Sequence, residues 1–160
     1  MLSVDLIYLG GEKELYFKEA AAEYKKRLGA FCTFSEKSIK DEKLPNSPSE
    51  TEIKTALEKE SVKILDNIPE KSFRIALCIE GKQLSSEELA DLFNSLPGKG
   101  FSRCAFLIGS SDGLSEHLKS TCHYKLSMSK MTFPHRLARV MLLEQIYRAF
   151  SILQGGKYHK

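Results

Sequence analysis

Residues 103–113 read Arg-Cys-Ala-Phe-Leu-Ile-Gly-Ser-Ser-Asp-Gly, an apolar run that leads directly into a glycine-containing loop. The run from Arg103 to Ile108 is short and continuous and ends at turn residues, which is typical of a buried strand. At Gly109 the absence of a Cβ lets a ligand approach the backbone at the carboxyl end of that strand, where open α/β sheets bind ligands. The stretch therefore predicts a strand of the sheet and a ligand cradle beside it.

On both sides of this stretch, apolar runs typical of strands alternate with patterns typical of helices. Strands are expected at 2–9, 30–35, 73–79, 103–108 and 124–128, and helices at 13–28, 49–67, 85–96 and 134–153, with a short helical turn after 113. A surface loop is expected between 37 and 49. This alternation predicts an α/β fold with a largely parallel sheet flanked by helices.

The length of 160 residues predicts one compact domain over 1–160, and 42% hydrophobic with 28% charged residues excludes a chain disordered by composition. The formal net charge of +3 is unevenly distributed. Residues 130–160 carry six Lys or Arg against one acid, Glu144, which gives +5, and the remainder carries −2. This asymmetry indicates a localised anion-binding face, with an ordinary solvated surface as the alternative.

Cysteine, metal and membrane signals are weak. Four cysteines, at 32, 78, 104 and 122, form no C-x-x-C pair and are interpreted as buried free thiols. Near His117, Cys122 and His123 nothing at metal-ligand spacing completes a set, so no metal is expected. With no basic leader and no run of roughly 18 apolar residues, we expect no membrane association and a cytoplasmic location.

The expected helix 134–153 carries apolar residues around most of its circumference, whereas a sheet can bury only one face of a helix. The apolar positions are Leu137, Val140, Met141, Leu142, Leu143, Ile146, Tyr147, Ala149, Phe150, Ile152 and Leu153. A homodimer interface is the simplest second partner. The alternative is a central helix buried on two sides within the monomer.

Gly109-x-Ser111-x-Gly113 matches the nucleophile elbow of serine hydrolases. A hydrolase needs an acid and then a histidine after the serine. The candidates, Glu144 and His159, fall inside a helix and at the C-terminus, which disfavours this function. The loop also lacks a P-loop lysine and a full G-x-G-x-x-G, so phosphate or dinucleotide binding is poorly supported.

Residues 126–139 combine a small polar loop with a helix that begins at a proline. Such a loop offers backbone N–H and C=O groups to a heteroaromatic ring, and the basic residues His135, Arg136 and Arg139 are placed to meet nucleic-acid phosphates. An ordinary connection between a strand and a helix is the alternative.

Four carboxyl-terminal motifs are distinctive: Leu107-Ile108-Gly109-x-x-Asp112-Gly113, Leu126-Ser127-Met128-Ser129-Lys130-Met131-Thr132-Phe133-Pro134-His135, Glu144-Gln145-x-Tyr147-Arg148-Ala149-Phe150 and Tyr158-His159-Lys160. Taken together, they resemble the large-subunit ribosomal RNA methyltransferase H family, the pseudouridine N3-methyltransferases of the SPOUT class. The resemblance extends to Gly10, Glu23-Tyr24-x-x-Arg27-Leu28 and Glu80-Gly81-Lys82. One departure is Ser110, where the family usually has the second of two adjacent glycines.

The resemblance implies a single SPOUT domain with a deep trefoil knot within about 73–160, which forms a homodimer. It also implies that S-adenosylmethionine binds in the knot loops. The implied cofactor residues are Leu77, Gly109, Met128, Ser129, Lys130, Met131, Thr132 and Phe133.

The reaction implied by the resemblance is methyl transfer to N3 of a pseudouridine in large-subunit rRNA within the ribosome. Arg148, Tyr158 and His159 are expected near the target, with Arg148 stabilising the developing imidate and His159 accepting the proton. Alternatively, Arg148 pairs with Glu144 and the tail only contacts RNA phosphate. A non-catalytic RNA-binding relative with the same fold is the competing function.

Overall fold

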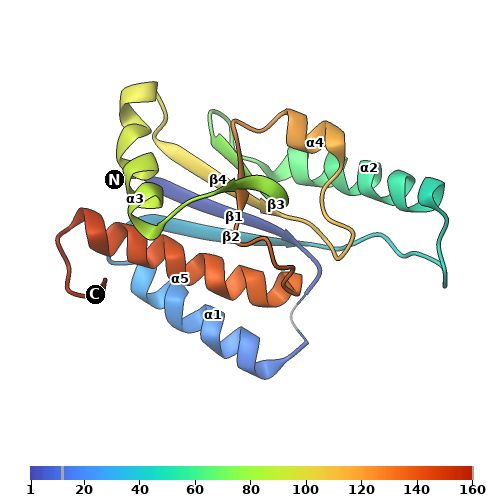
Figure 1. Ribbon diagram of the computed structural model, residues 1–160, viewed down its shortest axis with the longest axis horizontal. Coiled ribbons are helices and arrows are strands. Elements are labelled where there is room, and N and C mark those ends of the chain that lie inside the picture. Colours follow the sequence, from blue (N-terminus) through green and yellow to red (C-terminus); the bar gives the residue numbers. More distant parts are fainter. Residues whose placement is uncertain (12, 160) are drawn as a thin grey trace.

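A parallel β-sheet forms the centre of the computed structural model, which describes residues 1–11 and 13–159 (Figure 1). Within those ranges five strands are arranged in the order β2-β1-β4-β3-β5, and every neighbouring pair is parallel. The strands are β1 (Ser3–Leu9), β2 (Thr33–Ile39), β3 (Phe73–Gln83), β4 (Arg103–Ile108) and β5 (Tyr124–Ser127). The predicted α/β class with a mostly parallel sheet is confirmed.

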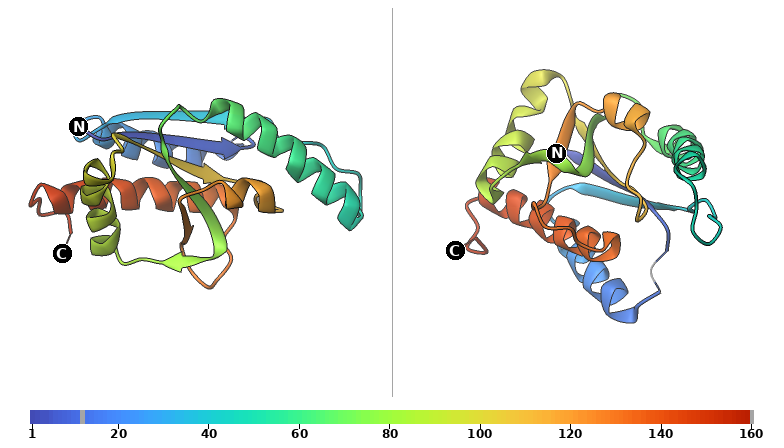
Figure 2. Two further views of the ribbon diagram at one scale, coloured as in Figure 1. Left: turned by 90° about the horizontal axis from the view of Figure 1, so that it is seen from above. Right: turned by 45° about the vertical axis from the view of Figure 1, so that its right-hand side comes forward.

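Helices cover both faces of the sheet (Figures 1 and 2). One face carries α1 (Leu15–Leu28), α3 (Ser86–Ser95) and α5 (His135–Leu153), and the other carries α2 (Glu50–Asn67) and α4 (Glu116–Ser120); a 3-10 turn, η1 (Pro97–Lys99), follows α3. Strand alternation divides the core, because Leu6 and Phe106 point to the first face whereas Ile7 and Leu107 point to the second. None of the helices within the described residues is long and apolar enough to cross a membrane.

Two helix starts follow directly from the local sequence. Ser49 accepts from the backbone N–H of Glu52, whose side chain accepts in return from the backbone N–H of Ser49, and Ser85 and Glu88 repeat the arrangement at α3. Both are capping boxes, which satisfy N–H groups that have no partner within the helix. The predicted beginnings of α2 and α3 are therefore confirmed.

Two predicted strands are corrected. Residues 30–32 form a turn instead of a strand, because Phe31 and Cys32 donate their backbone N–H groups to the carbonyl of Leu28, so β2 begins at Thr33. The strand predicted to end at 79 continues to Gln83. Its pairing with β5 shifts register between Leu77 and Lys82, so residues 78–81 bulge out of the ladder.

The apolar helix α5 lies between α1 and α3, which together cover much of its circumference (Figure 1). Leu142, Leu143 and Ile146 are completely buried, and Phe150 stacks against Phe31 and Phe93. The alternative of a helix buried on two sides within one chain is therefore largely what the structure contains. Several side chains, including Val140 and Met141, remain half-buried, so part of the helix surface is left for another partner.

Candidate functional site

A cleft of about 730 Å³ opens at the carboxyl ends of β3, β4 and β5. Its walls are the β3 bulge, the loop after β4 and the segment that joins β5 to α5. The lining residues that bear on the predicted site are Leu77, Gly109, Met128, Ser129, Met131, Thr132, Phe133 and His135. Lys130 belongs to the same loop, but its side chain is exposed and it is not among the lining residues. The structure thus brings together seven of the eight residues expected to hold the cofactor.

Gly109 is required by a close approach of two backbone segments. A Cβ at this position would lie 2.2 Å from the carbonyl oxygen of Gly113, because the loop folds back on itself and Ser110 bridges to Gly113. Gly113 has a φ of +83°, a backbone conformation that side chains disfavour. The loop is therefore a tight glycine turn that presents backbone to the cleft.

Ser111 does not occupy a strand-to-helix elbow. It is exposed, and the next helix begins only at Glu116. Glu144 and His159, the other members that a hydrolase would need, both contact Arg148 of α5 and do not line the cleft beside this loop. The geometry does not assemble a hydrolase site around Ser111.

Ser110 connects the glycine loop to α2. Its hydroxyl donates to Oε1 of Glu60 at 3.4 Å, and Oε2 of Glu60 accepts the backbone N–H of Glu42 at 2.9 Å. Glu60 is only 3% exposed, and its burial raises the pKa of the carboxyl group. Ser110 therefore adds a side-chain contact between the glycine loop and α2.

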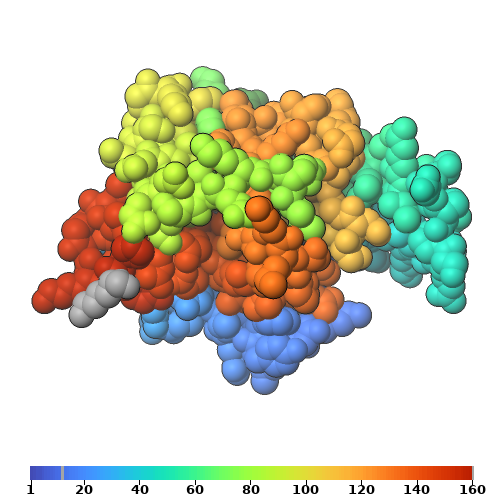
Figure 3. All heavy atoms as spheres, in the orientation of Figure 1, coloured from blue at the N-terminus to red at the C-terminus, as the bar shows by residue number. Residues whose placement is uncertain are grey.

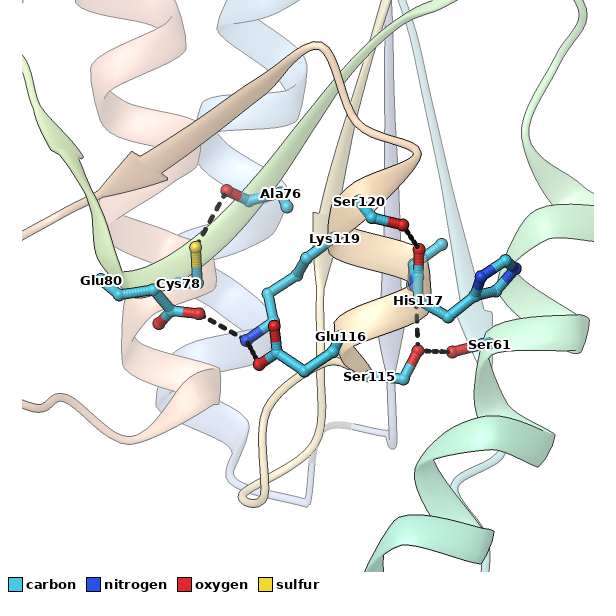
Figure 4. Close-up of polar contacts among 10 residues, drawn as sticks. Ser61, Ala76, Cys78, Glu80, Ser115, Glu116, His117, Lys119 and Ser120 are labelled. Atoms are coloured by element: carbon cyan, nitrogen blue, oxygen red, sulfur yellow. Dashed lines mark hydrogen bonds and ion pairs between the residues drawn. The ribbon is translucent and has the colours of Figure 1, made fainter.

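Glu80 of the β3 bulge and Lys119 of α4 both line the cleft and contact each other (Figure 4). The Lys119 ammonium donates to Glu80 and lies 2.7 Å from Oε1 of Glu116, and its side chain is 9% exposed. The contact with Lys119 lowers the pKa of Glu80. Sequence reasoning quoted Glu80 only for its resemblance and missed Lys119. The position of Glu80 just after the apolar part of a strand was the available signal.

Arg148, Tyr158 and His159 are brought together around two carboxylates. Arg148 donates to Oε1 of Glu144 through Nε at 2.9 Å and Nη2 at 2.5 Å, and Tyr158 donates to the same oxygen at 3.1 Å. Nδ1 of His159 lies 3.3 Å from Nη1 of Arg148, and its Nε2 lies 2.7 Å from Oε1 of Glu87. The Arg148–Glu144 pair foreseen as an alternative is present.

This carboxyl-terminal cluster is distant from the cleft within one chain. Arg148 lies 10 residues after Ala138, the last residue of α5 that lines the cleft, a separation of about 15 Å at 1.5 Å per residue. The chain leaves α5 at the end opposite to the segment that lines the cleft (Figure 1). The cofactor residues and the residues expected to be catalytic are therefore two separate groups in the single chain.

The three basic residues expected to face RNA have different environments. His135 lines the cleft, and burial, followed by the charge of Arg136, lowers the pKa of its imidazole. Arg136 is partly exposed and donates to both carboxylate oxygens of Glu14 at 3.1 Å. Arg139 departs from expectation: its side chain is 3% exposed, it donates to Glu36 at 2.6 Å and it lies over the Tyr8 ring. Arg139 is a core residue and is removed from the RNA-facing set.

The cysteines and the metal-ligating residues form no centre in the described part of the chain. Cys32 and Cys104 are buried free thiols, whereas Cys78 and Cys122 are half-buried. Burial raises the pKa of Cys32 to about 11. No group of three or more His, Cys, Asp or Glu side chains is arranged to hold a metal within residues 1–11 and 13–159.

The sequence matches one family model and is similar to named relatives along nearly its whole length. Residues 2–159 match the family model described as "Predicted SPOUT methyltransferase". The chain is 48% identical over 159 residues to the ribosomal RNA large subunit methyltransferase H of Clostridium botulinum (strain Kyoto / Type A2), covering 99% of this chain and 100% of the relative. Its identity to the protein of the same name from Streptococcus thermophilus is 45%, over the same shares of both chains.

A solved structure shares the fold. The probable methylase family protein from Haemophilus influenzae Rd KW20 superposes with a TM-score of 0.53 at 17% identity, covering 99% of this chain and 70% of that one.

Proposed function

The chain belongs to the SPOUT methyltransferase family, and on that premise we propose that it transfers a methyl group from S-adenosylmethionine to N3 of a pseudouridine in large-subunit rRNA. The observation that carries the proposal is the cleft at the carboxyl ends of β3, β4 and β5, in which three segments distant in sequence converge. The proposal treats residues 1–160 as one catalytic domain. The trefoil knot expected within about 73–160 stays a prediction.

The cleft fits a nucleoside-containing methyl donor. Its volume of about 730 Å³ falls within the range of small-molecule sites, roughly 300–1,000 Å³. Leu77, Ile108 and Phe133 supply apolar walls suited to a heteroaromatic ring, and the tight turn at Gly109 leaves backbone groups accessible beside them. The bound cofactor would supply a sulfonium-activated methyl group, so the chain has to align the acceptor nitrogen and manage one proton.

The carboxyl-terminal cluster contains side chains that can remove this proton and stabilise the resulting negative charge. Arg148 is a fixed cation that can stabilise negative charge developing on the uracil-like ring, and His159 can accept the imide proton. Burial and the hydrogen bond to Glu144 raise the pKa of Tyr158 to about 12, so its hydroxyl stays protonated and acts as a donor. Arg148 and Tyr158 both contact Glu144, which orients them.

A homodimer would join the two separated groups. A groove of about 570 Å³ runs between β5, α3 and α5, and its lining includes the apolar residues Leu84, Val140 and Met141. Figure 3 shows the segment that connects β3 to α3 lying beside the segment that follows β5, on one face of the molecule. A second copy seated on this face, with its α5 running in the opposite direction, would carry its tail toward the first copy's cleft.

The target is proposed to be rRNA within the assembled ribosome in the cytoplasm. The excess positive charge is confined to residues 130–160, so recognition of naked RNA should be weak and an assembled surface should supply further contacts. A base in an rRNA loop is also extruded at lower cost than a base in a duplex.

Two measurements test the function. Isothermal titration with S-adenosylmethionine should show binding, and mass analysis of rRNA from a deletion strain should show one lost methyl group on a pseudouridine. No binding even with added ribosomes would overturn the methyltransferase. Binding with unchanged rRNA methylation would instead favour a non-catalytic RNA-binding relative.

A mixing experiment tests the shared site. Gly109→Ala should disable the cleft and His159→Ala the tail, so each variant alone should be nearly inactive. In random mixtures about half of the dimers are heterodimers with one intact site of two, so co-expression should restore about a quarter of the parent activity. Lack of recovery in a preparation shown by light scattering to be dimeric would place the whole site in one chain.

A further inference from the structure

We propose that Glu80 binds the ribose hydroxyl groups of the cofactor and that Lys119 is the positioning residue that holds Glu80 in place. The inference rests on the proposed function, since it concerns the same cleft. It adds a recognition element outside the glycine loop and the segment after β5.

Glu80 lies where the sheet opens to form the cleft. Residues up to Leu77 pair with β5 in regular register, and pairing resumes at Lys82, so Glu80 belongs to the four-residue bulge. Gly81 makes the bulge possible, because a Cβ there would lie 2.7 Å from backbone atoms of Lys125 and Leu126. The bulge directs the Glu80 carboxylate to the cleft wall while its backbone rejoins the sheet.

Lys119 is itself held firmly, which makes it a suitable anchor. It is 8% exposed and belongs to α4, whose first turn is capped by Ser115, and Ser115 also contacts Ser61 of α2 (Figure 4). Burial by itself would lower the pKa of the Lys119 ammonium. The contacts with the carboxylates of Glu116 and Glu80 together outweigh burial, so the pKa of Lys119 is raised. A charged, immobile ammonium therefore fixes one end of the Glu80 carboxylate.

The two carboxylates on Lys119 are not equivalent. Glu116 is 87% exposed at its side chain and does not line the cleft, whereas Glu80 is 54% exposed and does. Lys119 contacts Oε1 of Glu80, and half of the side chain remains accessible. The contact with Lys119 keeps Glu80 ionised, so its carboxylate can act as a hydrogen-bond acceptor toward a ligand.

The Lys119 ammonium already neutralises Glu80, so a neutral ribose suits this acceptor better than the cationic ammonium of the methyl donor. The two adjacent hydroxyls of a ribose are donors, and dinucleotide-binding α/β folds use an acidic side chain to bind them. Asp112 is the other carboxylate in the cleft. It lies on the exposed turn after β4, outside the β3 bulge, and also lines a second cavity beside Asp41 and Glu42.

The test compares two probes that differ in one hydroxyl, S-adenosylhomocysteine and its 2′-deoxyribose analogue, titrated into the full-length protein. A hydrogen bond to a charged group predicts that the parent protein binds the deoxy analogue roughly 10- to 100-fold more weakly. Glu80→Gln should weaken binding of the ribose form and shrink that ratio to less than about threefold. Asp112→Asn is the matched control and should retain the parent ratio.

Lys119 is tested by the same ratio. Lys119→Met releases the Glu80 carboxylate and should reduce the logarithm of the affinity ratio between the two probes by about half. Lys119→Arg keeps the positive charge and should restore the ratio. Thermal unfolding of each variant separates loss of folding from loss of positioning. A merely structural Lys119 would lower affinity for both probes equally and leave the ratio unchanged.

Each failure has its own signature. Binding of neither probe by the parent protein would overturn the proposed cofactor, and with it this inference. Equal binding of both probes by the parent, or a ratio lost in Asp112→Asn but kept in Glu80→Gln, would overturn the role of Glu80 and leave the methyltransferase function intact.

Discussion

Buried Arg139 and half-buried Glu36 form an ion pair in which Nη2 donates to Oε2 at 2.6 Å. Arg139 lies on α5 and Glu36 on β2, and Glu36 also contacts Lys25 of α1. The pair thus joins the second strand to two helices on the same face of the sheet. A residue expected from its charge to meet RNA is instead part of the framework.

Replacing Arg139 should destabilise the fold. Arg139→Ala leaves the Glu36 carboxylate with Lys25 as its ion-pair partner among the described residues and empties the space over the Tyr8 ring. We expect the free energy of unfolding to fall by about 3 kcal/mol in urea titrations. Arg136→Ala is the control and should cost about 1 kcal/mol or less, since the side chains of Arg136 and Glu14 are partly exposed. Equal losses would contradict the structural role of Arg139.

Arg136 should contribute to ribosome association through charge. Arg136→Ala should remove one phosphate contact. The logarithm of the ribosome association constant should then fall less steeply with the logarithm of salt concentration, the slope being smaller in magnitude by about 0.7–0.9, while cofactor affinity stays nearly unchanged. Glu14→Gln should strengthen association, because Glu14 competes with phosphate for the Arg136 guanidinium. Both variants should be measured across a salt series, and an unchanged slope in both would exclude Arg136 from the RNA surface.

His159 should act in catalysis and not in cofactor binding. The ring is anchored by Glu87 and lies beside Arg148, away from the cleft of its own chain. His159→Ala should lower the single-turnover rate by 10²- to 10⁴-fold, the usual contribution of a general base, while the Kd for S-adenosylmethionine stays within about twofold. A rate equal to that of the parent across pH would remove His159 from the mechanism.

Tyr158 should make stability depend on pH in the alkaline range. Its pKa is raised to about 12, by burial and then by the hydrogen bond to Glu144, from an unfolded value near 10. Below pH 10 both states are protonated and the contribution to stability is complete. Between pH 10 and 12 the unfolded chain ionises first, so stability falls.

The measurement is urea unfolding at pH 9, 10 and 11 for the parent and for Tyr158→Phe. The phenylalanine variant lacks the ionisable hydroxyl, so its decline should be shallower than that of the parent. Parallel declines would show that Tyr158 does not titrate with the raised pKa.

Gly109 should not tolerate a side chain. Gly109→Ala places a Cβ 2.2 Å from the Gly113 carbonyl oxygen, so the loop must open and cofactor affinity should fall at least about tenfold. Gly98→Ala is the matched control, because nothing lies within 4 Å of a Cβ there and its φ is not positive. The control should bind the cofactor like the parent, and titration calorimetry with S-adenosylmethionine checks both variants.

Local signals in the sequence predicted most of the secondary structure. Ser49 and Ser85 mark helix starts because a capping box needs only residues three apart, and Gly109 marks the loop because a tight turn excludes a Cβ. The predicted end of β3 was wrong. Gly81 is typical of a turn in the sequence, but in the fold it allows β3 to approach the backbone of β5 closely. The start of β2 was wrong because the carbonyl of Leu28 captures the N–H groups that follow α1.

The sequence by itself determined the alternation of strands and helices, the glycine loop and the family motifs, since each depends on residues close together along the chain. Only the tertiary structure decided which charges pair. Arg139 and Glu36 are 103 residues apart, and Lys119 and Glu80 are 39 apart. Whether a cation faces solvent, a ligand or a carboxylate depends on how the layers pack, and that packing placed Arg139 in the core and Lys119 at the cleft.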